Sequence, residues 1–313
     1  MHITRYVDPH GGAAVGVDSN GRITPLDDVS SLGKLLRLPL SDIRARCEGT
    51  GGGPAIGRAD VRLLPPVDSL MEVWAAGVTY RRSREARVQE SDRAADVYEL
   101  VYDAERPELF FKSVAWRVTG HGEQISVRGD SEINVPEPEL ALVLNAHGET
   151  VGYTICNDVS SRSIEGMNPL YLPQAKVYLG GCAVGPAIRP AWELADPYAL
   201  TIRMSIERSG DVVWDGQAST AELRRNLDDL ASFLVREESF PEGAVLSTGT
   251  SLVPDLPFTL VPGDTVRIEI DELGVLKSRV AGGRDDMRWV VAAADNPARA
   301  CPLAEDRHIG SVR

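Results

Sequence analysis

The sequence predicts an α+β protein that is rich in β-strands. Residues 201–206 and 266–270 alternate apolar and polar side chains, which is typical of strands with one buried face. Residues 109–188 also show mostly strand-like patterns. The clearest helical pattern is a stripe of leucines, spaced three or four residues apart, within 223–234. Together these patterns indicate a sheet-rich fold with few helices and long connections between strands.

The first part of the chain is expected to form a small unit over residues 1–65, followed by a larger domain over 66–313. Residues 13–17 have the composition of a strand, and the polar segment 18–21 predicts the turn after it. Residues 30–36 predict a short helix. No recognisable catalytic pattern occurs in this leading unit.

The larger domain begins with a predicted buried strand over residues 72–79. Residues 82–103 are charged and rich in arginine, and predict a surface helix or a lid. Further along the chain, Ser219 and Glu222 have the spacing of a capping box, which predicts that the leucine-striped helix begins there.

Composition excludes several classes of partner. The formal net charge is −13, and such a surface repels nucleic-acid phosphates and anionic lipid. No apolar run of about 18 residues is present, so no membrane span is expected. An acidic protein that binds an anionic substrate needs a local positive charge, which a bound cation can supply.

The expected location is the cytoplasm. The first six residues lack the apolar core of a signal peptide. The four cysteines lie far apart and form no CxxC pair, which favours reduced thiols over a zinc site or a redox pair.

The most informative stretch is 135–140, in which Pro138 separates Glu137 from Glu139. Side chains two residues apart in an extended chain point the same way, so the two carboxylates share one face. Two adjacent like charges require that one carboxyl takes a proton or that a cation binds. Hard carboxylate oxygens suit Mg²⁺, Mn²⁺ or Ca²⁺. The alternative is that both glutamates lie on the solvated face of an edge strand.

A third acidic side chain, Asp158, ends a predicted strand over residues 151–158. This strand follows a polar turn at 147–149, and a hairpin would bring Asp158 back to the level of the glutamate pair. Three carboxylates would leave about three positions of an octahedral ion for water or substrate.

Several motifs, in this order along the chain, resemble the fumarylacetoacetate hydrolase superfamily over roughly residues 72–280. They lie at 110–113, 137–140, 152–162, 174–176, 185–186, 247–250 and 262–264. Within that superfamily the chain is most similar to the 2-keto-3-deoxy-D-arabinonate dehydratase group. The segments that carry this closer similarity are 77–80, 82–87, 105–112 and 168–176.

The resemblance implies a rolled, mixed β-structure with a small N-terminal domain, assembled as a homodimer or homotetramer. It implies that Glu137, Glu139 and Asp158 are metal ligands, with Mg²⁺ as the expected ion and Mn²⁺ or Ca²⁺ as alternatives. The implied substrate is a small 2-oxo acid. In the dehydratase group this is 2-keto-3-deoxy-D-arabinonate or xylonate, which is converted to 2,5-dioxopentanoate through a metal-bound enolate.

Two residues match positions that line the dehydratase site. The resemblance implies that Glu108 and Lys176 carry the proton transfers, taking a proton from C3 and helping the C4 hydroxyl to leave as water. The alternatives are that Lys176 forms a salt bridge or contacts the substrate carboxylate, and that Glu108 is an ordinary surface acid.

Five further residues are expected to contact the substrate. Ser83 and Arg84 lie in the arginine-rich segment, which can close over the ligand and bind its hydroxyls or carboxylate. Thr250 is a candidate for the substrate carboxylate. The set is completed by Tyr80 and Gln174, which lie in the motifs shared with the dehydratase group.

Hydrolysis is the runner-up activity. Hydrolases of this superfamily often carry a histidine and a glutamate that activate water, and Ser83 and Ala86 stand at the matching positions here. Neither can act as a base near neutral pH, and the five histidines offer no clear substitute. The alternatives to dehydration are therefore cleavage of a carbon–carbon bond in acylpyruvates or diketo acids, and a non-catalytic binding role.

Overall fold

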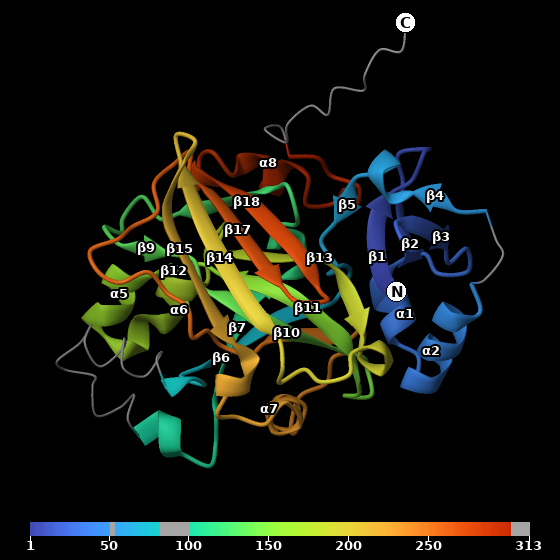
Figure 1. The fold of residues 1–313 in the computed structure, drawn as a ribbon, viewed down its shortest axis with the longest axis horizontal. Coiled ribbons are helices and arrows are strands. Elements are labelled where there is room, and N and C mark those ends of the chain that lie inside the picture. The colour runs from blue at the N-terminus through green and yellow to red at the C-terminus, as the bar shows by residue number, and fades with distance from the viewer. Residues whose placement is uncertain (51–53, 82–99, 302–313) are drawn as a thin grey trace, which may run out of the picture.

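The structure, a computed structural model, describes residues 1–50, 54–81 and 100–301 (Figure 1). Its main feature is an eleven-stranded sheet with the order β4-β3-β2-β1-β13-β11-β10-β16-β6-β7, and β5 pairs with β1 beside this path. The strands are β1 (His2–Val7), β2 (Ala13–Ser19), β3 (Arg22–Pro25), β4 (Ile56–Gly57), β5 (Leu63–Leu64), β6 (Glu72–Gly77), β7 (Glu108–Val114), β10 (Pro138–Leu144), β11 (Thr150–Asp158), β13 (Cys182–Pro190) and β16 (Ala244–Ser247).

A second, five-stranded sheet has the order β15-β14-β17-β18-β8, and β9 and β12 form a separate pair. These strands are β8 (Gln124–Val127), β9 (Asn134–Val135), β12 (Ser160–Ser161), β14 (Thr201–Arg208), β15 (Asp211–Ser219), β17 (Thr265–Ile270) and β18 (Gly274–Gly282). The helices are α1 (Leu32–Leu36), α2 (Leu40–Glu48), α5 (Arg162–Met167), α6 (Leu172–Lys176), α7 (Leu227–Leu234) and α8 (Arg288–Ala292). β16–β6 and β18–β8 are parallel pairs among antiparallel ones, which confirms the predicted β-rich, mixed fold.

The core lies on both faces of the large sheet. Leu140 and Leu142 of β10 face the small sheet, where they share one apolar cluster with Ile202 of β14. Ala141 and Val143, which point the other way, belong to a second cluster that includes the apolar side chains of α1. Every residue of β10 is therefore buried, as a central strand covered on both faces requires.

The hairpin between β10 and β11 confirms the prediction from the sequence. Glu139 pairs with Cys156, and Pro138 pairs with Asn157, so Asp158 returns to the level of the glutamates. Asn145 fixes the turn, because its side-chain oxygen accepts hydrogen bonds from the backbone N–H groups of residues 147 and 149, at 3.0 and 2.9 Å.

The predicted start of the leucine-striped helix is wrong. Ser219 accepts a hydrogen bond from the N–H of residue 221 and caps only a short 3₁₀ turn. Leu223 instead forms an antiparallel bridge with Tyr80, which draws this segment into an extended conformation. Helix α7 begins later, where Asn226 accepts hydrogen bonds from the N–H groups of residues 228 and 229. A tertiary contact therefore overrides the local capping signal.

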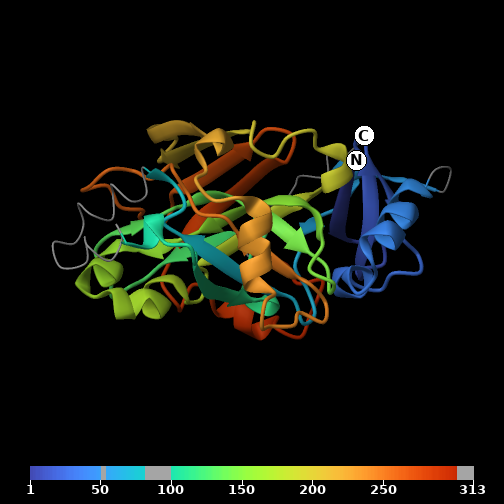
Figure 2. The ribbon, with the colours of Figure 1, turned by 90° about the horizontal axis from the view of Figure 1, so that it is seen from below.

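The N-terminal strands continue the large sheet, because β1 pairs with β13 through Ile3 and Ile188. Figures 1 and 2 show these strands with α1 and α2 on one side of the molecule. Among the described helices, none is long and apolar enough to cross a lipid bilayer.

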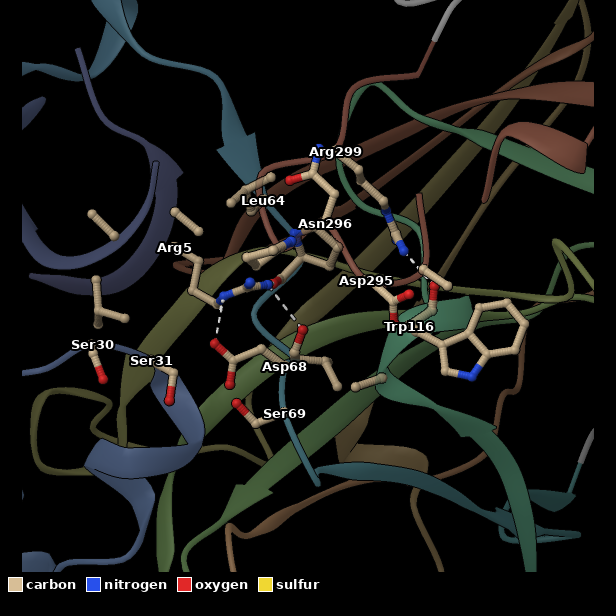
Figure 3. Close-up of a pocket in the computed structure, with 18 of the residues that line it drawn as sticks. Arg5, Ser30, Ser31, Leu64, Asp68, Ser69, Trp116, Asp295, Asn296 and Arg299 are labelled. Atoms are coloured by element: carbon tan, nitrogen blue, oxygen red, sulfur yellow. Dashed lines mark hydrogen bonds and ion pairs between the residues drawn. The ribbon is translucent and has the colours of Figure 1, made fainter. Parts of the chain in front are cut away.

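A cavity of about 440 Å³ lies where the N-terminal strands meet the segment 64–69 and residues 294–299 (Figure 3). At its wall the buried Arg5 donates from Nε to Asp68, at 2.9 Å. Asp68 also accepts the N–H groups of Leu32 and Gly33 at the start of α1, at 2.9 and 2.8 Å. One carboxylate thus joins β1 to the first turn of the helix that covers the sheet.

Asp68→Asn is expected to destabilise the fold by about 3 kcal/mol, because it leaves the buried Arg5 without its counter-charge. Urea unfolding measures the loss. The matched control is Glu48→Gln, which removes the charge from the exposed Arg44–Glu48 pair and should cost less than about 1 kcal/mol. Equal effects of the two variants would contradict the role given to Asp68.

Candidate active site

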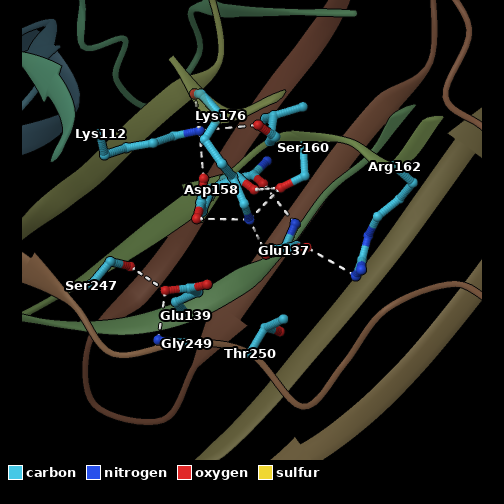
Figure 4. A network of polar contacts seen from close by, with 12 residues as sticks. Lys112, Glu137, Glu139, Asp158, Ser160, Arg162, Lys176, Ser247, Gly249 and Thr250 are labelled. Atoms are coloured by element: carbon cyan, nitrogen blue, oxygen red, sulfur yellow. Dashed lines mark hydrogen bonds and ion pairs between the residues drawn. The ribbon is translucent and has the colours of Figure 1, made fainter. Parts of the chain in front are cut away.

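Three buried carboxylates come together at the end of the β10–β11 hairpin (Figure 4). Glu137, Glu139 and Asp158 each offer an oxygen within 4.8 Å of the others. Their exposed fractions are 2%, 1% and 1%. Since β10 lies inside the sheet, the alternative of a solvated edge strand is wrong. A cluster of like charges this deeply buried requires compensation by protons or cations.

Two of these carboxylates each have one oxygen paired with a buried basic side chain. Arg162 Nη2 contacts Glu137 Oε1 at 2.9 Å, and Lys112 Nζ pairs with Asp158 Oδ1. Arg162 is the first residue of α5, whereas Lys112 reaches the site from β7. These pairs fix the orientation of the two carboxylates and direct their other oxygens toward the centre of the cluster.

The third carboxylate, Glu139, is held by neutral donors. Its Oε2 accepts the hydroxyl of Ser247 at 2.5 Å and the N–H of Gly249 at 2.7 Å. No donor among the described residues contacts its Oε1. Burial, followed by the charge of Asp158, raises the pKa of Glu139 well above its ordinary value. Without a cation beside it, this carboxyl therefore tends to keep a proton.

Lys176, the last residue of α6, places its ammonium between the carboxylates. Its Nζ donates to Glu137 Oε2 at 2.7 Å, to Asp158 Oδ2 at 3.1 Å and to Ser160 Oγ at 2.6 Å. The Ser160 hydroxyl donates a hydrogen bond to the carbonyl oxygen of Asp158, so its oxygen is the acceptor for the lysine. The centre of the Phe110 ring lies 5.6 Å from Nζ, so the ring covers one side of the ammonium.

The carboxylates and Lys176 face a shared cavity. Its wall also includes Glu108, Glu165 and Thr250. Glu108 is the first residue of β7 and stands opposite Gly77, where a side chain on the neighbouring strand would occupy the same space. Glu165 belongs to α5 and is 3% exposed. The cavity thus combines a row of acids with one lysine, a set suited to binding oxygens and moving protons.

The donor atoms of this region suit a divalent cation. Its acidic groups are Glu108, Glu137, Glu139, Asp158 and Glu165, and among the described residues Lys112, Arg162 and Lys176 contact Glu137 or Asp158. Three of these carboxylates, Glu137, Glu139 and Asp158, each offer an oxygen within 4.8 Å of the others. Such hard oxygen ligands are those that Mg²⁺, Mn²⁺ and Ca²⁺ prefer. The residues therefore fit such an ion.

The five residues expected to contact substrate are placed differently. Thr250 lines the cavity, and its hydroxyl donates to the carbonyl of residue 138 at 2.9 Å. Tyr80 is fully buried and lies outside the described wall of the cavity. Burial and the nearby Glu139 raise the pKa of this tyrosine. The side chain of Gln174 is exposed on α6. Ser83 and Arg84 lie outside the described residues.

No histidine lies among the described residues that line the cavity. His121, which the sequence places in a loop, accepts the backbone N–H of Lys277 through Nδ1 at 3.3 Å. Ser83 and Ala86, which stand where hydrolases of the superfamily carry the histidine and the glutamate, lie outside the described residues. A histidine that activates water is therefore absent from the described wall.

Three buried residues of the site were not predicted. Lys112 stands in a strand of aromatic residues, where a lysine signals a buried partner. Arg162 follows the Asp158 strand by four residues, and Glu165 lies one helical turn further on. For Lys112 and Arg162 the available signal was their position in motifs shared with the superfamily, whereas Glu165 lies outside those motifs. Only the fold shows which carboxylate each basic side chain contacts.

Comparisons with known proteins agree with this geometry. Residues 72–281 match the family model described as fumarylacetoacetate (FAA) hydrolase C-terminal. The chain is 53% identical over 215 residues to a probable 2-keto-3-deoxyxylonate dehydratase of Haloferax volcanii, covering 69% of this chain and 73% of that protein. It is 44% identical over 220 residues to a 2-dehydro-3-deoxy-D-arabinonate dehydratase of Saccharolobus solfataricus, covering 69% of this chain and 74% of that protein.

A solved structure shares the fold over most of the chain. It is that of 2-keto-3-deoxy-D-arabinonate dehydratase complexed with magnesium and 2,5-dioxopentanoate. The TM-score is 0.78 at 37% sequence identity, and the match covers 91% of this chain and 100% of that chain.

Proposed function

Because this chain belongs to the fumarylacetoacetate hydrolase family, we propose that it is a metal-dependent dehydratase of 2-keto-3-deoxypentonates. The proposed substrate is 2-keto-3-deoxy-D-arabinonate or xylonate, and the proposed product is 2,5-dioxopentanoate. The relatives at 53% and 44% identity support this substrate class. The observation that carries the proposal is the cavity in which one lysine and five acids meet without a histidine among the described residues of its wall.

The proposed ion is Mg²⁺, with Mn²⁺ or Ca²⁺ as substitutes, and its proposed ligands are Glu137, Glu139 and Asp158. When bound, it supplies a Lewis acid that holds the carboxylate and C2 carbonyl oxygens of a 2-oxo acid and acidifies its C3 protons. Arg162, Lys112 and the loop at 247–249 hold the three carboxylates in place, since each contacts one oxygen of one ligand. Support for the ion comes from the buried cluster of three carboxylates and from the magnesium in the similar structure.

Lys176 and Glu108 share the two proton transfers of the proposed dehydration. One removes a proton from C3, and the other gives a proton to the hydroxyl that leaves C4 as water. The resulting enone becomes the aldehyde when a proton moves from C5 to C3 and another moves from the C5 oxygen to C4. Both side chains line the cavity, and Lys176 is buried against Phe110, where bulk water does not compete for its proton.

The proposed contacts with the rest of the substrate are Tyr80, Ser83, Arg84, Gln174 and Thr250. Thr250 has the strongest support, because it lines the cavity beside Gly249. Gln174 has less, because its side chain faces solvent in the described structure.

The activity is tested by incubating the purified protein with Mg²⁺ and 2-keto-3-deoxy-D-arabinonate. Mass spectrometry should show the loss of one water, and a hydrazine reagent should trap the new aldehyde. Chelation of the metal should stop the reaction. Acetylpyruvate is assayed in parallel, and its cleavage into two acids without dehydration of the sugar acid would establish hydrolysis instead. Binding of 2-oxo acids with no turnover would establish a non-catalytic role.

Gly77→Ala is expected to lower kcat about tenfold, since the new methyl group would collide with Glu108 Oε2 and push this carboxyl out of place. Stability should change little, because the obstructed group is the end of a flexible side chain. The control is Gly129→Ala, where nothing lies within 4 Å of the added carbon. If the effect acts through Glu108, adding Glu108→Ala to Gly77→Ala should give the same rate as Glu108→Ala alone. Multiplied effects would oppose this explanation.

We also propose that the protein is cytoplasmic and forms a homodimer or homotetramer, with residues 1–65 as a small N-terminal domain. Exposed apolar side chains at Met167 and Leu170, which are 62% and 83% exposed, support assembly. A separate apolar cluster around Tyr6 and Ile23 supports the N-terminal domain. Size-exclusion chromatography with light scattering measures the oligomer size.

A further inference from the structure

Among the described residues, Lys112 is a deeply buried basic side chain that takes no part in the proposed proton transfers. Its side chain is 0% exposed. Its Nζ donates to the carbonyl oxygen of Val159 at 3.0 Å and to that of Lys176 at 2.6 Å, and it pairs with Asp158 Oδ1. The two carbonyls take two of the three N–H groups of the ammonium, and the contact with Asp158 is an ion pair. These contacts direct Lys112 at the protein, and Lys112 is not among the described residues that line the cavity.

These acceptors belong to the two elements that carry the proposed chemistry. Asp158 ends β11 and Val159 follows it, whereas Lys176 ends α6. Lys112 comes from a third element, β7, and contacts both ends at once. Figure 4 shows its side chain extending toward Asp158 and the backbone of Lys176. One side chain thus sets the position of a proposed metal ligand relative to that of the proposed proton carrier.

We propose that Lys112 is a positioning residue that holds the Asp158 carboxylate and the end of α6 in register for metal binding and proton transfer. This inference rests on the proposed function. Lys112 fixes one oxygen of Asp158, so the other oxygen stays directed at the centre of the carboxylate cluster, 3.1 Å from Lys176 Nζ. Lys112 also donates to the carbonyl oxygen of Lys176, which ends the five-residue helix α6 and lacks an intrahelical donor.

No uncharged side chain reproduces these contacts. An ammonium removed from contact with water is costly unless it is paired and hydrogen-bonded, and here two carbonyls and one carboxylate lie around Nζ. The Tyr178 ring, centred 5.8 Å from Nζ, covers another side of the charge. Methionine has a similar length but donates nothing, so Lys112→Met leaves one carboxylate oxygen and two carbonyls without this partner. The Asp158 side chain is then free to turn away from the cluster.

The first test needs no turnover. Binding of Mn²⁺ to the whole protein is measured by calorimetry for wild type, Lys112→Met and the control Ser113→Ala. Ser113 is the next residue of β7, and its hydroxyl donates to the carbonyl of residue 114 at 3.1 Å. We expect the Kd for Mn²⁺ to rise about 10- to 100-fold in Lys112→Met, as for other residues that orient metal ligands, and to stay unchanged in Ser113→Ala. A folded Lys112→Met variant that binds Mn²⁺ within about threefold of wild type overturns the proposal.

If Lys112→Met does not fold, as judged by circular dichroism, Lys112→Arg takes its place. Arginine keeps the charge, but its planar guanidinium cannot direct three N–H groups from one atom to these acceptors. We expect Lys112→Arg to bind Mn²⁺ at least about tenfold more weakly than wild type, as for other residues that orient metal ligands. Wild-type affinity in this variant overturns the proposal as well.

The second test uses kinetics at saturating Mg²⁺. Lys112→Met should lower kcat about 100-fold, with KM changed less than about threefold, because a displaced proton carrier slows the reaction without removing a substrate contact. A purely structural role would lower the melting temperature and leave kcat per folded molecule unchanged, which would overturn the inference. If wild type itself does not dehydrate the sugar acid, the proposed function fails, whereas the Mn²⁺ measurement still decides the role of Lys112.

Discussion

Replacing Lys176 with methionine should lower kcat for dehydration about 1,000-fold at saturating Mg²⁺, since general acid–base groups contribute about 10²–10⁴-fold each. Lys176 is 2% exposed and places Nζ between Glu137 and Asp158, on the wall of the proposed substrate cavity. Methionine preserves the bulk against Phe110 and removes the group that carries the proton. Steady-state kinetics with 2-keto-3-deoxy-D-arabinonate measures the loss.

The same variant separates the roles that the sequence left open for Lys176. A lysine that only contacts the substrate carboxylate would raise KM and leave kcat close to wild type. One that only forms a salt bridge would lower stability and leave both kinetic constants unchanged. Lys277→Met is the control, because Lys277 is exposed on β18. A kcat for Lys176→Met within about tenfold of the control, below the range for general acid–base groups, would exclude the proposed proton transfer.

Glu139→Gln is expected to abolish the stabilisation of the fold by Mg²⁺. An ion bound only by the native state stabilises it by about 2.7 kcal/mol at a concentration of 100 times Kd. Glutamine can still accept the Ser247 hydroxyl and the Gly249 N–H through its carbonyl oxygen, so the local fold should persist. Its amide NH₂ group then takes the place of Oε1, and its partial positive charge opposes a cation there. Thermal melts with and without Mg²⁺ measure the difference.

The control for this charge removal is Glu132→Gln. Glu132 is exposed in the connection that leads to β9, and it lies outside the described wall of the cavity. Its variant should keep the full response to Mg²⁺. An equal response in Glu139→Gln would remove Glu139 from the set of metal ligands, even if the protein proved to be a dehydratase.

Strand periodicity predicted that the two glutamates share one face, and the resemblance to the superfamily favoured a carboxylate cluster over a solvated edge strand. Glu137 and Glu139 lie two residues apart, and the hairpin turn before residue 150 fixes the level of Asp158. These relations are local, so a single stretch of about twenty residues contains them. The contacts of Lys112 and Arg162 could not be predicted in the same way. Lys112 contacts Asp158 from β7, which is distant in sequence, and the contact of Arg162 with Glu137 depends on the path of the chain after β11.

The same limit explains the misplaced start of α7. Ser219 and Glu222 satisfy a local rule, but Leu223 bridges Tyr80, which lies more than a hundred residues away in the chain. The motif that contains Tyr80 predicts a substrate contact, and this stays a prediction. The Tyr80 side chain is fully buried and is not among the described residues that line the cavity. Local patterns therefore predicted the elements better than the partners of individual side chains.

The pairing of β1 with β13 has a consequence for any attempt to shorten the protein. β13 lies between β1 and β11, so the strand that ends in Asp158 is one neighbour away from the amino-terminal strands. A fragment that began at residue 66 would uncover backbone donors and acceptors along β13, together with the apolar side chain of Ile188. Such exposed strands recruit other chains, so truncation invites aggregation. We therefore expect the leading segment to shield β13 from self-association, although none of its described residues lines the cavity that holds the carboxylates.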